Sequence, residues 1–420
     1  MNERSRIGTE SRRIILHSDM NCFYASVEMM LDPSLRGRAV AVCGSTENRH
    51  GIVLAKSQKA KEAGIKTGMV NWEARRRCPD LIIVPPQYSQ YVKYSRLAQA
   101  IYQSYTDQVE PYGMDECWLD VTRSTGVFGS GMDIARMISR RIKEELGLTV
   151  SIGVSFNKRF AKLGSDLRKP DAITEIPEER FREIVWPLPA ENLLFVGRST
   201  RRKLEEYGIT TIGQIAEAPP GFLHQLLGVN GLALKAAAMG EDYSPVTHRD
   251  FQAPIKSVGH GITCYADLNT EEVWKVMLEL SQDIGHRLRI YGLRAGGVQI
   301  SIRESELGFR QHQGMLPMTT QSPSEIADRA FQLFKESYHW VMPVRAVTVR
   351  AISLSPVGMP EQVEAFTDVH HAIRQEEVDN CVEQIRERFG KGAIRPASLM
   401  GDLKMPFDGR DLVRMPGHVN

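Results

Sequence analysis

The feature that most constrains the fold is a short apolar segment that ends at an acidic residue. Residues 13–17 (RIILH) read as a short buried strand, and Asp19 follows at the C-terminal end of this strand. A helix-like run over residues 23–30 comes directly afterwards. An acidic side chain at the exit of a buried strand is well placed for chemistry.

A second acidic position, the pair Asp115 and Glu116, stands at an expected turn. Residues 108–112 and 117–122 read as two strands, and Gly113 between them favours a tight connection. Neighbouring side chains on a regular strand point to opposite faces. Both acids can therefore converge on one point only at a turn or a bulge.

Strands and helices alternate through the first part of the chain, which predicts an α+β unit with one sheet covered by helices. Residues 91–106 and 132–146 carry helical patterns, and residues 149–154 read as a further strand. Residues 40–84, broken by four glycines, mix short strands with small helices. We interpret them as a small insertion.

Two further units follow along the chain. Beyond residues 186–189 (WPLP) the pattern is helical until about residue 243, and a polar connector follows. The third unit is again α+β, and apolar and polar side chains alternate over residues 298–303. This alternation predicts a sheet with one apolar face against helices and one polar face outward. Its expected elements are the strands 298–303 and 344–354 and the helices 273–291 and 324–339.

Composition excludes several classes of protein. No apolar run reaches the roughly 20 residues of a spanning helix, and the N-terminal residues lack the apolar core of a signal peptide. The six cysteines show no C-x-x-C spacing, which argues against a zinc site or a disulfide framework. The net charge of +2 means that any nucleic-acid contact must come from local patches. We expect a cytoplasmic protein with no membrane partner.

The acids Asp19, Asp115 and Glu116 have the chemistry of a two-metal site. Phosphoryl transfer by two divalent cations needs carboxylates that bridge them, and three such side chains from two segments suffice. A lone Asp-Glu dipeptide is more often a solvated turn, and an acid before a helix is more often its cap. The surrounding sequence must decide between the two interpretations.

Four segments and the helical stretches after them decide it, because they occur together in this order: DMNCFYASVE, GIKTGM, DECWLD and SIGVSFNKRFAKLGSDLRKP. Together they resemble the Y-family DNA polymerases, and specifically their bacterial DNA polymerase IV branch, over almost all of residues 12–355. The resemblance implies a multidomain α+β, right-hand polymerase. It would be an error-prone translesion DNA-directed DNA polymerase without a proofreading exonuclease, which adds nucleotides from dNTPs to a primer 3′-OH.

The resemblance also implies a division into domains. A ferredoxin-like palm would hold residues 1–22 and 88–175, and small fingers would hold residues 23–87. A helical thumb with helix-hairpin-helix elements would span residues 176–243, and a linker residues 244–254. The α+β little finger would span residues 255–357 and a C-terminal tail residues 358–420.

In such a palm, Asp19, Asp115 and Glu116 would hold two Mg²⁺ ions, for which Mn²⁺ could substitute. The backbone carbonyl of Met20 would be a further ligand, and Glu116 would be the catalytic acid. Asp120 matches the family text as well, but a strand residue that stabilises the turn explains it equally, so we leave it outside the site.

The resemblance implies that five side chains contact the incoming nucleotide. Tyr24 would be the steric gate that collides with a ribose 2′-hydroxyl, and Phe23 would pack under the sugar. Lys169 would reach the triphosphate. Gln58 and Lys61 stand where relatives commonly carry Tyr and Arg for the same purpose, so the amide and the ammonium replace a phenol and a planar guanidinium.

The resemblance implies DNA contacts that do not depend on the base sequence. Ile52 and Leu54 would lie over the templating base as a bulky roof. The thumb turn Phe195-Val196-Gly197 keeps only Gly197 of the two family glycines, and a plain helical hairpin is the alternative for this element. Arg303 and Arg350 would meet template phosphates, or else be solvated surface arginines.

Residues 358–420 are the least informative part, with an expected amphipathic helix over residues 376–389 before Gly390. Primer-template DNA and dNTPs are the expected partners of a monomer, and a sliding clamp is expected by family analogy only, because no convincing clamp-binding peptide is found. Two other classes remain to be excluded. A non-catalytic accessory protein typically loses the carboxylates, and a nucleotide cyclase would not explain the hairpins.

Overall fold

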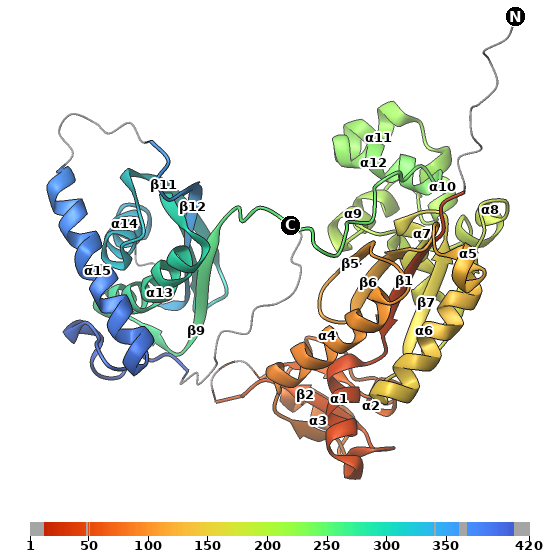
Figure 1. Cartoon of the computed structure of the whole chain (residues 1–420), viewed down its shortest axis with the longest axis horizontal. Helices are drawn as coiled ribbons and strands as arrows, with labels where there is room; N and C mark the ends of the chain where they lie inside the picture. Colours follow the sequence, from red (N-terminus) through yellow and green to blue (C-terminus); the bar gives the residue numbers. More distant parts are fainter. Residues whose placement is uncertain (1–11, 48, 50, 340–341, 361–367, 407–420) are drawn as a thin grey trace, which may run out of the picture. The chain divides into compact units, whose positions relative to one another are not determined.

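The computed structural model of the chain describes residues 12–47, 49, 51–339, 342–360 and 368–406. Its described residues divide into two compact units, one with residues 12–44 and Ile52–Gln252, the other with those within 45–51 and 253–406 (Figure 1). The extreme ends of the expected palm and tail, residues 1–11 and 407–420, lie outside the described residues.

A five-stranded sheet forms the centre of the first unit, in the order β5-β6-β1-β7-β8. The central strand β1 pairs antiparallel with β6 on one side and with β7 on the other. The order β7-β1-β6-β5 is that of a ferredoxin-like sheet, and β8 is added parallel to β7. The strand expected at RIILH and the hairpin expected around Gly113 are both present. The strands are β1 (Ile15–Met20), β5 (Val109–Pro111), β6 (Glu116–Asp120), β7 (Val150–Ser155) and β8 (Ile173–Ile176).

Helices cover both faces of this sheet, so every residue of β1 is buried. Leu16 packs into the core made with α4 (Tyr88–Gln103) and α6 (Gly131–Leu146), whereas Ile15 packs on the opposite side with Ala161 of α7 (Lys158–Leu167). Helix α7 approaches β7 very closely. A Cβ atom added to Gly153 would lie 1.9 Å from the carbonyl oxygen of Ala161, so only glycine permits this contact.

The expected insertion between β1 and α4 forms a small three-stranded sheet with its own apolar core, in the order β3-β2-β4. Strand β3 is short. Its first residue, Val53, is buried, whereas Ile52 immediately before the strand is 39% exposed. Its elements are α1 (Phe23–Leu31), β2 (Val40–Cys43), β3 (Val53–Lys56), α2 (Gln58–Glu62), α3 (Asn71–Arg77) and β4 (Ile82–Val84).

Short helices follow β8, and their apolar residues share one core with Phe160 and Leu163 of α7. Gly228, with φ +65°, both ends α11 and begins α12, as a tight helical hairpin requires. The helices are α8 (Phe181–Val185), α9 (Arg198–Glu205), α10 (Ile212–Glu217), α11 (Pro220–Leu227) and α12 (Val229–Ala238).

The first part of the expected linker is attached to the first unit. The Glu110 carboxylate on β5 accepts hydrogen bonds from Lys158 Nζ at 2.6 Å and from the backbone N–H of Thr247 at 2.9 Å. Val246 is 3% exposed, and the Arg249 N–H donates to the Asp107 carbonyl. The connector is therefore pinned to the sheet up to about residue 249.

The second unit is a four-stranded antiparallel sheet in the order β11-β10-β12-β9, with helices α13 and α14 packed on its apolar face. The alternation expected over residues 298–303 is present, with Val298, Ile300 and Ile302 buried. The sequence pattern missed β9 and β11. The elements are β9 (Val258–Leu268), α13 (Thr270–Tyr291), β10 (Leu293–Glu304), β11 (Phe309–Thr320), α14 (Pro323–Ser337) and β12 (Val344–Pro356).

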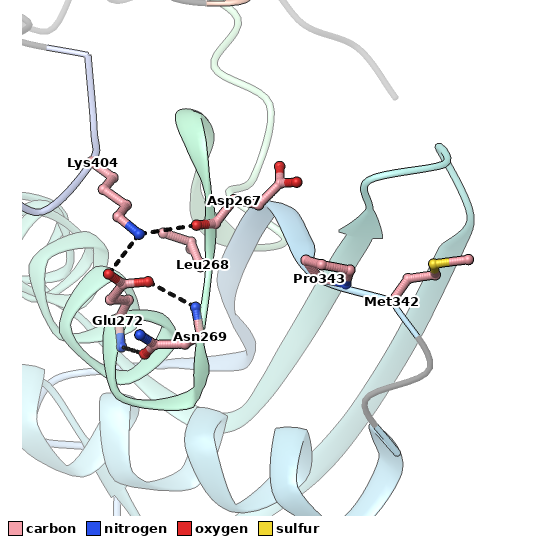
Figure 2. Close-up of a pocket in the computed structure, with 7 residues that line it drawn as sticks. All are labelled: Asp267, Leu268, Asn269, Glu272, Met342, Pro343 and Lys404. Atoms are coloured by element: carbon pink, nitrogen blue, oxygen red, sulfur yellow. Dashed lines mark hydrogen bonds and ion pairs between the residues drawn. The ribbon is translucent and has the colours of Figure 1, made fainter.

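A further helix, α15 (Val369–Phe389), begins before the expected residue 376 and ends as expected at Gly390. Ion pairs attach it to the neighbouring elements, for example Arg294 with Glu376 at 3.0 Å. A shallow cavity of 420 Å³ opens beside the first turn of α13, where Lys404 Nζ donates to Glu272 and to the carbonyl of Asp267 (Figure 2). This cavity contains none of the expected site residues.

Two expectations from composition can be compared with the structure. None of the six cysteines forms a disulfide. Within the described ranges, no helix has the length and apolar character needed to cross a bilayer.

Candidate active site

Sheet register brings the three acids together from two distant segments. Asp19 near the end of β1 lies directly opposite Glu116, the first residue of β6. Asp115 immediately precedes that strand, and its carbonyl accepts the N–H of Met20 at 2.9 Å. The turn before them depends on Gly113, whose φ is +88°. All three carboxyls therefore gather at one end of the β1–β6 pair.

Two lysines approach these carboxyls from α7 and the residues after it. Lys169 Nζ lies 2.5 Å from Asp19 Oδ2 and 2.7 Å from Asp166, and Lys162 Nζ lies 2.5 Å from Glu116 Oε2. Among the described residues, no group of three or more His, Cys, Asp or Glu has the arrangement of a formed metal site. Asp19 and Glu116 are each turned towards a lysine.

A buried histidine completes the surroundings of Glu116. His17 is fully buried, and its Nε2 lies 3.4 Å from Glu116 Oε2. The Ser165 hydroxyl donates to the carbonyl of Lys162, and His17 Nδ1 lies 2.8 Å from the same hydroxyl oxygen. Sequence reasoning missed both His17 and Lys162. The period of two, which places His17 on the same face of β1 as Asp19, was the signal that could have found the histidine.

The neighbouring carboxyls differ in proton affinity. Burial raises the pKa of Asp19 to about 7, with a further contribution from Glu116 and Asp115 and against the opposing charge of Lys169. Burial also raises the pKa of Asp115. Burial acts in the same direction on Glu116, but His17 and Lys162 outweigh it and lower that pKa to about 2. Glu116 is therefore the most firmly ionised of the three.

Tyr24 and Phe23 begin helix α1 close to the acids. Phe23 is 3% exposed and belongs to the core, whereas Tyr24 is only partly buried. Burial raises the pKa of Tyr24 to about 12, and the charge of Asp115 contributes, so the phenol stays neutral. The N-cap Cys22 takes a left-handed backbone conformation, φ +51°. This places the aromatic pair within reach of the site.

The expected triphosphate residues of the insertion lie on one short helix. Gln58 is the first residue of α2, and its amide donates to Glu62 at 3.1 Å. Lys61 is exposed on the same helix. The charges of Lys61 and Lys169 both act on the Cys22 thiol, whose pKa is raised by burial.

The thumb turn that lacks a glycine still adopts the glycine conformation. Phe195 has φ +75°, a region that non-glycine residues seldom occupy, and its ring is 66% exposed. The guanidinium of Arg159 covers the ring at 5.3 Å. Gly197 is the N-cap of α9, and no heavy atom lies within 4 Å of the position that a Cβ atom would take there. Space for a phosphate approach is therefore present at Gly197.

Arg303 and Arg350 lie on the polar face of the second sheet. Arg350 pairs with Gln299 across the β10–β12 ladder, and Arg303 follows four residues along β10 on the same face. Both side chains are exposed, and Arg350 donates to Ser257 at 3.3 Å. The sheet thus presents two cations opposite the face covered by α13 and α14.

Comparison with known proteins finds matches to one protein family in two stretches of the chain. The impB/mucB/samB family matches residues 18–166, and the C-terminal domain of that family matches residues 255–364. The chain is 47% identical to DNA polymerase IV of Acetivibrio thermocellus over 93% of this chain and 98% of that protein. It is 35% identical to DNA polymerase IV 1 of Bacillus subtilis over 92% and 93% of the two chains.

A solved structure agrees in fold. The Y-family DNA polymerase chimera Dbh-Dpo4(243-245)-Dbh superposes with a TM-score of 0.73, at 23% identity, over 81% of this chain and 98% of that chain. The two proteins therefore share a mixed α+β fold over most of this chain.

Proposed function

The chain belongs to the Y family of DNA polymerases, in the bacterial DNA polymerase IV branch, and we propose that its nucleotide transfer takes place at Asp19, Asp115 and Glu116. It is a translesion DNA-directed DNA polymerase, and its substrates are DNA and dNTPs. The observation that supports the location is the register, which puts Asp19 opposite Glu116 and hydrogen-bonds Met20 to Asp115.

The donor set suits two Mg²⁺ ions, or Mn²⁺ in their place. The three carboxylates and the carbonyl of Met20 are the oxygen ligands that such hard cations prefer. When bound, the ions activate the primer hydroxyl and neutralise the charge of the leaving pyrophosphate. Family membership implies a divalent metal requirement in general, and the assignment of these four ligands is our proposal.

The protein's own groups have distinct tasks in the transfer. The primer 3′ oxygen forms a bond to the α-phosphorus, and the bond from that phosphorus to the pyrophosphate oxygen breaks. Glu116, held ionised by His17 and Lys162, serves as the catalytic acidic residue of the site in its carboxylate form. Lys169 binds the triphosphate, with Lys61 and Gln58 as weaker contacts from α2. Tyr24 excludes the ribose 2′-hydroxyl, and Phe23 packs under the sugar.

The thumb and the second sheet bind the DNA backbone. Gly197 offers the open N-terminus of α9 to a phosphate, and the cations Arg303 and Arg350 contact template phosphates. These contacts are independent of base sequence, as a polymerase requires. The sliding clamp and the monomeric state remain predictions from the family resemblance.

Primer extension tests the location of the site. With Mg²⁺, the wild type should extend a primer on undamaged and abasic templates, and Asp115→Ala should lose extension by at least about 100-fold, because one metal ligand is removed. Asp120→Asn is the matched control, since Asp120 Oδ1 accepts hydrogen bonds from Thr122 that an asparagine retains, and the substitution removes only the charge of a long ion pair with Arg13 at 3.8 Å. Normal extension by Asp115→Ala would refute the assignment, and no extension by the wild type would favour a non-catalytic accessory protein.

A further inference from the structure

A buried carboxylate lies behind the proposed steric gate. Glu28 is 4% exposed, and it stands on α1 four residues after Tyr24. Residues four apart on a helix share a face, so both side chains are directed to the same neighbouring element, α4. A buried carboxylate is costly unless hydrogen bonds satisfy it. Its presence there needs a reason.

The Glu28 carboxylate holds the far end of one tyrosine ring. The hydroxyl of Tyr91 on α4 donates to Glu28 Oε1, and the side-chain amide of Gln87 donates to Oε2 at 2.7 Å. The same Tyr91 oxygen accepts the backbone N–H of Gln87 at 3.0 Å. The hydroxyl is thus fixed both as donor and as acceptor, and burial raises the pKa of Tyr91 and keeps it protonated.

The fixed ring is the surface on which the gate rests. The rings of Tyr24 and Tyr91 stack with centroids 4.1 Å apart and an interplanar angle of 8°. Tyr88 meets both rings edge-on, and Phe23 packs against Tyr91 at 6.2 Å. Because Tyr24 lies flat on a fully buried ring, a tilt or shift of Tyr91 passes directly to Tyr24.

We propose that Glu28 is a positioning residue for sugar selection, which acts through Tyr91 to fix the ring of Tyr24 against the ribose 2′-hydroxyl. The inference rests on the proposed gate role of Tyr24. Steric exclusion is steep in distance, so a small displacement of the gate admits the extra oxygen of a ribonucleotide. A deoxyribonucleotide lacks that oxygen and is nearly indifferent to the same displacement.

Single-nucleotide insertion by the full chain measures this effect as the ratio of kcat/KM for a dNTP to that for the matching rNTP. Tyr91→Phe keeps the stacked ring but removes the hydroxyl, and it should lower the ratio about tenfold through faster rNTP insertion, with the dNTP value within about twofold of wild type. Glu28→Gln keeps one acceptor oxygen and should lower the ratio about threefold.

The matched control is Tyr94→Phe on the same helix. Its hydroxyl donates to Met30 Sδ at 3.4 Å, and the substitution removes the same atom as Tyr91→Phe. We expect the wild-type ratio for this variant. The melting temperatures of all variants show which of them fold. If Tyr91→Phe does not fold, the ratio measured for Glu28→Gln tests the proposal.

A Tyr24→Ala variant separates the two proposals. If Tyr24→Ala collapses the ratio while Tyr91→Phe and Glu28→Gln match wild type, the role of Glu28 is refuted and the gate stands. Equal losses for dNTP and rNTP in the Glu28 and Tyr91 variants would also refute it, since they indicate a structural role alone. An unchanged ratio in Tyr24→Ala would refute both the gate role of Tyr24 and the role of Glu28 that rests on it.

Discussion

The contact between α7 and β7 predicts a severe effect from one added methyl group. Gly153 lies opposite His17 in the sheet, and its Cβ position is 1.9 Å from Ala161 O and 2.5 Å from Ser165 N. Both atoms belong to the backbone of α7 and cannot rotate away. Because ordinary contacts are about 3.5 Å, Gly153→Ala must move α7 from the sheet by roughly 1.5 Å.

This displacement acts on stability and on catalysis at once. Overpacking of this kind costs about 3 kcal/mol, which corresponds to a fall in Tm of roughly 6–12 °C for a unit of this size. Helix α7 also carries Lys162 and leads to Lys169, so the two ammonium groups shift relative to Glu116 and Asp19. A displacement of about 1 Å in a reactive arrangement can cost about 100-fold in rate.

Thermal melting and single-nucleotide insertion well below Tm measure the two effects separately. Gly126→Ala in α5 (Thr125–Phe128) is the control, because no heavy atom lies within 4 Å of its Cβ position and its φ is not positive. We expect Gly126→Ala to retain stability and rate. If Gly153→Ala melts and inserts nucleotides like the wild type, the close packing of α7 on β7 is wrong.

Two further predictions concern the template and the second unit. The variant Ile52→Ala/Leu54→Ala should bypass bulky template lesions better than wild type, because it removes a bulky roof; equal bypass in a primer-extension assay would refute the roof. Asp283→Asn should cost about 2 kcal/mol at neutral pH in urea unfolding, because the buried Asp283 loses its ion pair with Arg287 at 3.4 Å and its contact with His260 at 3.2 Å is weakened. These groups outweigh burial and lower the pKa of Asp283, so its contribution is present above the unfolded pKa of about 3.9 and is lost as pH falls through the folded value. A difference from wild type that persists unchanged in acid would contradict this account.

Local pattern predicted most of the first sheet and its turn. The apolar run of β1 and the glycine at residue 113 are signals contained within a few residues, and both features are present. Strands β9 and β11 were missed for a physical reason. Most side chains of the edge strand β11 are exposed, so it lacks the apolar alternation that identifies a strand, and glycines interrupt β9.

The surroundings of the acids were harder to predict than the acids themselves. His17, Lys162 and Glu28 act only because α7 crosses β1 and α4 packs beside α1, contacts that join residues far apart in the chain. Phe195 shows the reverse. The missing glycine left a plain helical hairpin as the alternative for this turn, but Phe195 takes a left-handed backbone conformation with the guanidinium of Arg159 over its ring, which the motif alone did not predict.

The attachment of the connector indicates at which residues the second unit can be exchanged between related polymerases. A hybrid joined at residue 244 would separate Val246 and Thr247 from the buried surface and from Glu110 that receive them, so the two parental sequences would have to match there as well. A junction at Gln252–Ala253 leaves those contacts within one parent. Recombination between homologous polymerases should therefore tolerate breakpoints near residue 252 more readily than near residue 244. The exchangeable unit therefore begins near residue 253 and not at residue 244, where the polar connector starts.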